Sequence, residues 1–288
     1  MTSYIKLMRP KHYIKNVLIL LPLIFGGKLF NIFKDPKIIF AFIAFCLACS
    51  IVYIINDIKD VESDKIHEIK KNRPIASGLV TEKNAFILMI FLLIGTAVFN
   101  FLAGNSFLSW FLIIIYILIN ILYSLKLKNV PLLDVSILVL GFLIRLIFGS
   151  VVTGIVISNW LYLTIMGFSF YLGLGKRRNE IRKQGTNTRK VLKYYSQEFL
   201  DKNMYMCLTL TNTFYALWCI DPKINALYPN LIWTVPLVLL ICMKYSMDIE
   251  SDSHGDPLDT VMKDKTLIIL SIIYAVIIFF SIYGSRIF

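Results

Sequence analysis

Residues 37–64 of the 288-residue chain read KIIFAFIAFCLACSIVYII, followed directly by NDIKDVESD. Among the first nineteen residues only Lys37 is charged, and an apolar run of this length can span a bilayer as an α-helix. Lipid offers the backbone no hydrogen-bond partners, so only helices and closed barrels cross it, and this run is too long for a barrel strand. The stretch therefore predicts an all-α membrane protein with carboxylates at the mouth of a spanning helix.

The rest of the chain repeats this pattern. Its residues are 57% hydrophobic and 14% aromatic, which excludes an ordinary soluble domain. The apolar segments of spanning length are 14–33, 37–55, 84–103, 106–125, 131–151, 157–175, 203–221, 228–247 and 266–284. We expect one domain over residues 1–288, a polytopic membrane helical bundle of about nine transmembrane helices.

The cationic residues predict the orientation of this bundle. Of the 30 Lys and Arg residues, 24 lie in the amino-terminal stretch and the loops on its side of the membrane, 5 lie on the other side, and Arg145 lies inside a segment. By the positive-inside rule the amino terminus and the long polar loops are cytoplasmic and the carboxyl terminus is outside. The net charge of +12 then reflects topology and anionic lipid headgroups, not nucleic-acid binding.

The polar residues after the first quoted run have a regular spacing. At about 100° per residue, Asp57, Asp60 and Asp64 fall on one helical face. Carboxylates so close together repel each other unless a cation lies between them. Mg²⁺ takes one or two carboxylates and fills its remaining positions with water and phosphate oxygens. The motif, with Asn56 at its start, indicates magnesium and a phosphorylated substrate at the membrane surface.

Basic residues follow in two places. Lys70, Lys71 and Arg73 lie close in sequence to the acidic motif and suit a metal–diphosphate complex, although a solvated loop with internal salt bridges is the alternative. Residues 175–183 read GKRRNEIRK, a segment that topology alone could explain. In the functional interpretation Lys176 and Arg177 anchor a phosphate.

Some polar residues lie within apolar segments. Asp134 and Arg145 are eleven residues apart, so they share a helical face but lie about 16 Å apart and each needs another partner. Lys15 and Asn16 are the deepest polar residues of the first segment and either face the site or act as interfacial anchors. Cys46-x-x-Cys49 is interpreted as helix packing, not as a metal or redox site.

With Asn56-Asp57-x-x-Asp60-x-x-x-Asp64 and nine expected helices, the whole chain resembles the UbiA superfamily of intramembrane prenyltransferases. Within it the chain is similar to the polyprenyl-phosphate phosphoribosyltransferase branch. The motifs that carry this finer resemblance are Arg9-Pro10, Lys15-Asn16, Arg73-Pro74-Ile75-Ala76-Ser77-Gly78, Tyr123-Ser124 with Lys128, Leu133-Asp134-Val135, Arg145, Lys176-Arg177-x-x-Glu180, Gly255-Asp256-Pro257 and Asp264-Lys265. Glu68 departs from the branch, which usually has proline after the histidine, and this concerns only the local shape of the loop.

The resemblance implies a reaction and a set of site residues. The donor would be 5-phosphoribosyl 1-diphosphate, the acceptor a polyprenyl phosphate in the cell membrane, and the cofactor Mg²⁺, in a route towards cell-wall polysaccharides. Catalytic roles would fall to Asp57, Asp60 and Asp64, and metal binding to these three residues and Asn56. Substrate-binding roles would fall to Lys15, Asn16, Lys70, Arg73, Tyr123, Lys128, Asp134, Arg145, Lys176, Arg177 and Glu180.

Two alternatives remain open at this point. An aromatic, quinone-pathway prenyltransferase of the same superfamily would use a polyprenyl diphosphate. Such enzymes carry a second aspartate-rich motif where this chain has Lys176-Arg177-Arg178-Asn179-Glu180, and the exchange of acid for base favours direct phosphate binding. A transporter or flippase using Asp134 and Arg145 is the other alternative, although the polar residues crowd one side of the expected membrane.

Overall fold

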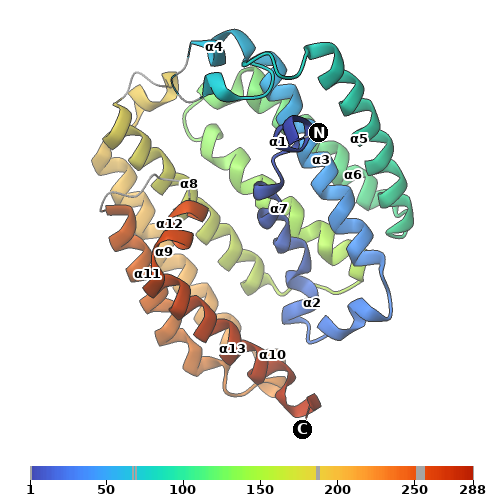
Figure 1. Ribbon diagram of the computed structural model, residues 1–288. Coiled ribbons are helices and arrows are strands. Elements are labelled where there is room, and N and C mark those ends of the chain that lie inside the picture. Colours follow the sequence, from blue (N-terminus) through green and yellow to red (C-terminus); the bar gives the residue numbers. More distant parts are fainter. Residues whose placement is uncertain (1, 67, 69, 186–188, 251–256, 288) are drawn as a thin grey trace. The chain divides into compact units, whose positions relative to one another are not determined.

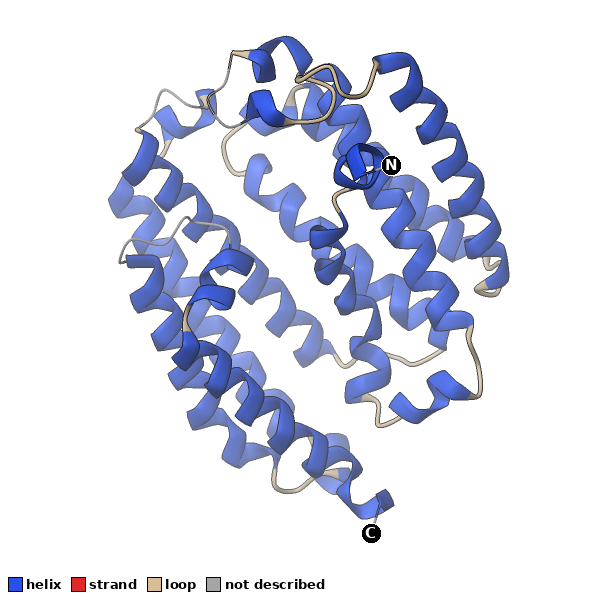
Figure 2. Ribbon diagram, in the orientation of Figure 1, coloured by secondary structure: helices blue, strands red, loops and turns tan. Residues whose placement is uncertain are grey.

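The structure is a computed structural model that describes residues 2–66, 68, 70–185, 189–250 and 257–287. Within these ranges every regular element is a helix, as Figure 2 shows. The α-helices and short 3-10 helices (η) in chain order are α1 Thr2–Met8, η1 Pro10–Leu20, α2 Leu21–Phe25, η2 Leu29–Phe33, α3 Lys37–Lys59, α4 Val61–Lys65, η3 Lys70–Asn72, α5 Glu82–Leu102, α6 Phe107–Leu125, η4 Leu127–Asn129, α7 Leu133–Thr153, α8 Asn159–Gln184, η5 Lys190–Tyr194, α9 Gln197–Ile220, α10 Pro222–Leu227, η6 Leu231–Thr234, α11 Val235–Glu250, α12 Pro257–Lys263 and α13 Lys265–Ile287.

The helices form two compact units, whose elements are labelled in Figure 1. Unit 1 comprises Met1–Leu127 and Ile144–Val156, and unit 2 comprises Lys128–Leu143 and Ile157–Phe288. The first half of α7 belongs to unit 2 and its second half to unit 1. The single domain over residues 1–288 stays a prediction.

α3 is the central helix of unit 1. It contacts α1, η1, α5 and α6, and 61% of its most apolar stretch is buried. The corresponding stretches of α5 and α6 are only 22% and 28% buried, and large apolar side chains on them, such as Phe91 and Phe107, are exposed. A contiguous apolar surface of this kind is a membrane-facing or partner-facing surface. Burial in unit 1 therefore decreases from the central helix α3 to the outer helices α5 and α6, as expected for helices in lipid.

Four of the long helices begin at a side-chain cap. The hydroxyls of Thr81, Ser106, Ser158 and Ser196 accept a hydrogen bond from the backbone N–H three residues further on, at the starts of α5, α6, α8 and α9. Such caps satisfy one of the N–H groups that a helix start leaves without a partner. They therefore fix where these four helices begin.

Close approaches between helices occur at glycines. A Cβ on Gly149 of α7 would lie 2.0 Å from the carbonyl oxygen of Ile19 in η1, within unit 1. In unit 2, where α8 and α9 pack along each other, a Cβ on Gly167 would lie 2.8 Å from Thr211 Oγ1. Any side chain at these two positions would push the neighbouring element away.

The first predicted span needs correction. Residues 14–33 do not form one helix, because the segment is divided among η1, α2 and η2. Pro22 lies at the start of α2, and Gly27 takes a left-handed conformation (φ 66°) that ends it. Glycine adopts that conformation without the steric penalty of a Cβ, so the turn can form at this point.

Six helices among the described residues are long and apolar enough to cross a membrane: Lys37–Lys59, Glu82–Leu102, Phe107–Leu125, Leu133–Thr153, Leu231–Glu250 and Lys265–Gly284. The expected count of nine is not confirmed. The first segment is broken, while α8 and α9 have sufficient length (26 and 24 residues) but are less apolar.

Candidate functional site

The acidic motif lies where α3 ends and α4 begins, in unit 1. α3 ends at Lys59, Asp60 takes φ −91° and ψ 8°, and α4 starts at Val61. Backbone hydrogen bonds from Asp60 N to the Asn56 carbonyl (2.9 Å) and from Asp64 N to the Asp60 carbonyl (2.8 Å) continue the helical spacing of the motif through this junction. Asp57 and Asp64 are both 2% exposed, while Asp60 is half-buried.

Two arginines neutralise the buried carboxylates. Arg9 Nη2 lies 2.5 Å from Asp57 Oδ1. Arg73 Nη1 lies 3.2 Å from the same oxygen and 2.6 Å from Asp64 Oδ2. Arg73 therefore bridges the two carboxylates, as a cation between like charges should. Both arginines are about a quarter exposed, so their outer edges can be reached from solvent.

Arg9 is a site residue that the sequence reasoning missed. It links α1 to η1 in a left-handed conformation (φ 56°), which is uncommon for a residue with a side chain. Its guanidinium carbon lies 4.9 Å from the centre of the Tyr53 ring. Burial lowers the pKa of Arg9, and the nearby Asp57 carboxylate opposes that effect. Arg9-Pro10 entered the sequence analysis only through a family resemblance, and no local pattern showed that it reaches Asp57.

The chemistry of this cluster suits a divalent cation held jointly with a substrate. Asp57 Oδ2 is buried and has no hydrogen-bond partner among the described residues. Mg²⁺ commonly uses one or two carboxylates together with phosphate oxygens and water. In the described ranges no three His, Cys, Asp or Glu side chains are grouped closely enough to hold a metal by themselves. The residues therefore fit a metal bound through one or two carboxylates, and not a cage of three.

Asn56 is held from α6. The Ser124 hydroxyl donates a short hydrogen bond to Asn56 Oδ1 and also lies 2.9 Å from the carbonyl oxygen of Asn120. Lys59 Nζ donates to the backbone carbonyl of Ser124. Ser124 is 4% exposed, so this connection between the ends of α3 and α6 is shielded from solvent. It fixes the side chain at the start of the acidic motif.

Three other predicted residues of unit 1 lie at its more accessible positions. Lys70 is exposed in η3, three residues before Arg73. Lys15 in η1 and Tyr123 in the last turn of α6 are half-buried. His67, in the same loop as Lys70, and Gly255-Asp256 lie outside the described residues.

Arg145 and Asn16, both predicted to bind substrate, contact each other inside unit 1. Arg145 Nε donates to Asn16 Oδ1 (2.7 Å), and Nη2 donates to Tyr116 OH (2.9 Å) and to Cys49 Sγ (3.2 Å). The guanidinium carbon also lies 4.8 Å from the centre of the Tyr116 ring. These partners are neutral, so hydrogen bonds and a ring face solvate the charge. Cys46 and Cys49 are buried free thiols that form hydrogen bonds with the Asn16 side chain, which is consistent with a role in helix packing.

Asp134 has its partners in unit 2. Its Oδ2 accepts from Arg177 Nε (2.5 Å) and its Oδ1 accepts from Tyr195 OH (2.6 Å), while Arg177 Nη1 donates to Glu180 (2.8 Å). The Tyr195 oxygen in turn accepts from the backbone N–H of Leu132 (2.6 Å). Burial, with the hydrogen bond to Asp134, raises the pKa of Tyr195 to about 12. Asp134, Arg177, Glu180 and Tyr195 are called the Asp134 cluster below.

The contacts of Arg177 correct its expected role. Its side chain is 1% exposed and lies between two carboxylates, so it holds the Asp134 cluster together instead of facing a substrate phosphate. Lys176, by contrast, is half-buried and makes no ion pair with any described residue. It also lies inside α8, which continues to Gln184, and not in a loop.

The other cations of this segment also have internal partners. Arg178 pairs with Asp201 of α9, and Arg182 donates to the backbone carbonyl of Glu250. Lys128, the remaining predicted residue of unit 2, is half-buried in η4. The arginines of this segment therefore bind other protein groups, whereas Lys176 makes no ion pair with a described residue.

A profile of the UbiA prenyltransferase family matches residues 20–263. The chain belongs to this family. Decaprenyl-phosphate phosphoribosyltransferase of Mycolicibacterium smegmatis is 33% identical over 304 residues, covering 99% of this chain and 93% of the relative. The protein of the same name from Corynebacterium glutamicum is 30% identical over 286 residues, covering 97% and 86%. The resemblance drawn from the motifs is confirmed.

Solved structures of UbiA proteins share the fold. A UbiA homolog from Archaeoglobus fulgidus bound to GPP and Mg²⁺ has a TM-score of 0.69 at 16% identity, covering 97% of this chain and 99% of that one. The same homolog bound to DMAPP and Mg²⁺ has a TM-score of 0.70 at 15% identity, with the same coverage. Together with the six apolar helices, membership of the UbiA family makes the chain a multi-pass membrane protein.

Proposed function

We propose that this chain transfers 5-phosphoribose from 5-phosphoribosyl 1-diphosphate to a polyprenyl phosphate and releases diphosphate. The observation that carries the proposal is the identity of 30–33% over nearly the whole chain to decaprenyl-phosphate phosphoribosyltransferases. Residues 176–183 contain no second aspartate-rich motif and present Lys176, which has no ion pair with a described residue, and this supports the same reaction.

The reaction requires little proton transfer from the protein. The bond between ribose C1 and the diphosphate oxygen breaks, and its electron pair leaves with the diphosphate. An oxygen of the lipid phosphate forms the new bond to C1. That phosphate is largely ionised near pH 7, since its second pKa is about 6, so no strong general base is needed. The main task of the protein is to position the two phosphorylated substrates and to balance their charges.

The acidic motif would serve the leaving diphosphate. Asp57, whose Oδ2 has no hydrogen-bond partner among the described residues, would hold Mg²⁺ together with at most one further carboxylate of the motif, Asp60 or Asp64, and with Asn56 beside them. When bound there, the ion neutralises charge that develops on the departing diphosphate. Arg73 lies against the same carboxylates with a quarter of its side chain exposed, and it would bind a diphosphate oxygen from that position.

The remaining predicted substrate-binding residues would fall into two groups, according to how deeply their side chains are buried. Lys15, Lys70, Tyr123, Lys128 and Lys176 are exposed or half-buried and would contact substrate phosphates or the ribose. Asn16, Asp134, Arg145, Arg177 and Glu180 are held by one another or by further protein groups and would position the helices that carry the first set.

The orientation follows from the charge distribution. We place the amino terminus and the acidic motif on the cytoplasmic side of the cell membrane and the carboxyl terminus outside. A soluble sugar diphosphate can reach Asp57 from that side, while the lipid acceptor reaches it from the bilayer.

A second candidate is transfer of a prenyl group from a prenyl diphosphate. It is favoured by the likeness to UbiA structures that hold GPP or DMAPP with Mg²⁺. The two candidates differ in which substrate carries the diphosphate, so one experiment can separate them.

The test uses membranes containing the full chain, Mg²⁺, labelled 5-phosphoribosyl 1-diphosphate and a polyprenyl phosphate. We expect a labelled lipid, its loss on chelation of Mg²⁺, and its loss in Asp57→Asn. The matched control is Glu62→Gln, because Glu62 lies in the same motif but its side chain is 80% exposed. Failure to label lipid of any chain length by a folded protein, combined with consumption of a prenyl diphosphate, would establish the second candidate instead.

A further inference from the structure

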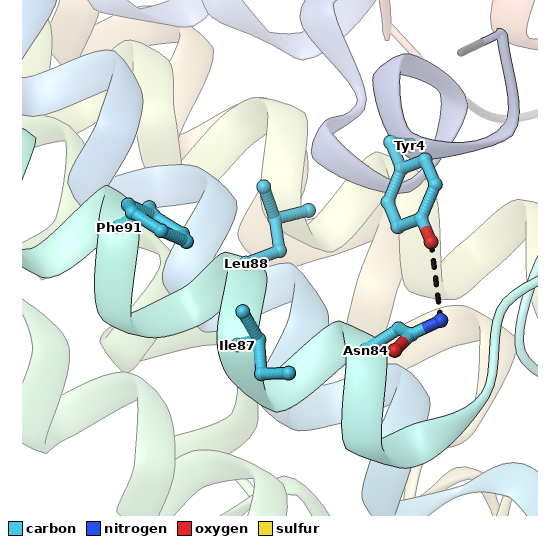
Figure 3. A pocket seen from close by; sticks show the side chains of 5 residues that line it. All are labelled: Tyr4, Asn84, Ile87, Leu88 and Phe91. Carbon is cyan, nitrogen blue, oxygen red and sulfur yellow. Dashed lines mark hydrogen bonds between the residues drawn. The ribbon is translucent and has the colours of Figure 1, made fainter.

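A groove on unit 1 lies apart from the acidic motif. It has a volume of about 280 Å³ and is lined by Tyr4 of α1 and by Asn84, Ile87, Leu88 and Phe91 of α5. Figure 3 shows the Tyr4 hydroxyl pointing to the Asn84 amide, with the three apolar side chains following along α5.

The groove is amphiphilic along its length. The four residues of α5 occupy positions i, i+3, i+4 and i+7, so they form one stripe along the helix. The stripe is polar at Asn84, near the helix start, and apolar from Ile87 to Phe91, where the side chains of Ile87 and Phe91 are 43% and 67% exposed. A ligand that matches it has a polar head and a hydrocarbon chain.

The polar end can bind an anion. Asn84 Nδ2 donates to Tyr4 OH (3.3 Å), which leaves the tyrosine hydrogen available to an incoming oxygen. Lys6 and Lys83, the sequence neighbours of these two residues, are exposed. Lys6 Nζ reaches the carbonyl of Asn72 (3.3 Å), which follows Lys70 and Lys71 in η3. Close to these lysines in sequence are two exposed carboxylates, Glu68 and Glu82.

We propose that this groove binds an anionic phospholipid of the bilayer. One acyl chain lies along Ile87, Leu88 and Phe91, and the phosphate accepts hydrogen bonds from Tyr4 and Asn84 beside the lysines. A hydrocarbon chain gains little by leaving other lipid tails for apolar side chains. Selectivity therefore comes from the headgroup, at roughly fivefold for each lysine near an anionic lipid.

Native mass spectrometry of the full chain in detergent tests the proposal. The protein is titrated with dioleoyl phosphatidylglycerol and, separately, with dioleoyl phosphatidylcholine. We expect the first lipid bound to be phosphatidylglycerol, with at least a tenfold preference. Lys83→Gln should lower this preference about fivefold. Tyr4→Phe should weaken the binding of both lipids, because both carry the phosphate that its hydroxyl would contact. The control Lys34→Gln, at an exposed lysine elsewhere in unit 1, should leave it unchanged.

A second pair of variants tests the location. Ile87→Trp fills the groove and should remove the first bound lipid. Ile90→Trp should not, because Ile90 has nearly the same exposure (42% against 43%) but does not line the groove. Equal binding of the two phospholipids, or equal effects of the two tryptophans, would overturn the proposal. So would displacement of phosphatidylglycerol by an equal concentration of polyprenyl phosphate, which would identify the acceptor lipid as the occupant.

Discussion

The Asp134 cluster gives a prediction that separates a structural arginine from a substrate-binding one. In Arg177→Gln the carboxylate of Asp134 loses its cationic partner while its side chain stays fully buried, at 0% exposure. The bond from Tyr195 remains but carries no charge. We expect a folded but strongly destabilised protein.

The size of the effect follows from burial. Removing one partner of a buried ion pair typically costs about 3–5 kcal/mol, because the other charge is left uncompensated. Glu180 contributes less, since it is 21% exposed and can be solvated. A loss of this size lowers the folded-to-unfolded ratio by roughly two to nearly four powers of ten. In a chain of this length it corresponds to a fall in Tm of roughly 6–20 °C.

The assay is thermal unfolding of the purified protein in detergent, followed by tryptophan fluorescence. The matched control is Arg178→Gln, one residue along α8. Its partner Asp201 is 32% exposed, so we expect a loss of about 1 kcal/mol. Arg177→Gln combined with Asp134→Asn should recover much of the stability, because no buried charge is then unpaired. Lys176→Gln should leave Tm unchanged and raise the KM for a phosphorylated substrate.

Two results would refute this reasoning. One is an equal loss of stability in Arg177→Gln and Arg178→Gln. The other is an Arg177→Gln protein with normal Tm and a raised KM for the donor, which would make Arg177 a phosphate ligand after all.

Three further predictions concern other contacts. Ser124→Ala frees Asn56, so we expect a roughly 10–100-fold loss of activity with a higher Mg²⁺ concentration at half-maximal rate; an unchanged Mg²⁺ dependence would contradict it. Gly149→Ala brings a Cβ to 2.0 Å from a backbone oxygen of η1 and should lower the free energy of unfolding by about 1–3 kcal/mol. The control Gly95→Ala should cost less, because the nearest atom to its Cβ is the flexible end of a leucine side chain. Equal effects of the two substitutions would argue against the close approach. The raised pKa of Tyr195 means that its protonated form is favoured in the folded state. Its contribution to stability is therefore present below pH 10 and is lost as pH rises towards about 12. The difference in Tm between the parent protein and Tyr195→Phe should shrink over that interval and stay constant below it.

The features that could be predicted from the sequence are those that depend on residues close together along the chain. The apolar runs at 37–55, 84–103 and 106–125 correspond closely to α3, α5 and α6, because run length and composition are local properties. The spacing of Asp134 and Arg145 correctly implied that each has its own partner. The prediction of a span at 14–33 failed because hydropathy does not register the turn that Gly27 permits.

The partners themselves could not be predicted in this way. Asp134 meets Arg177 across 43 residues, and Arg145 meets Asn16 across 129. A single sequence carries no signal for such pairings, so Arg177 looked like any other cation in a basic segment. The same limit hid Arg9, whose contact with Asp57 lies 48 residues away.

The two intramembrane charges differ in when their partners are synthesised. Asn16, Cys49 and Tyr116 all precede Arg145 in the chain, so these three neutral partners of the guanidinium already exist when α7 leaves the ribosome. Asp134 is in the opposite position, because Arg177 and Tyr195 follow it by 43 and 61 residues. At a translation rate of about 5–20 residues per second, Tyr195 is synthesised roughly 3–12 s after Asp134. Synthesis of unit 2 therefore includes an interval in which the Asp134 carboxylate must be solvated by water or protonated, whereas Asn16, Cys49 and Tyr116 are already present when Arg145 is made.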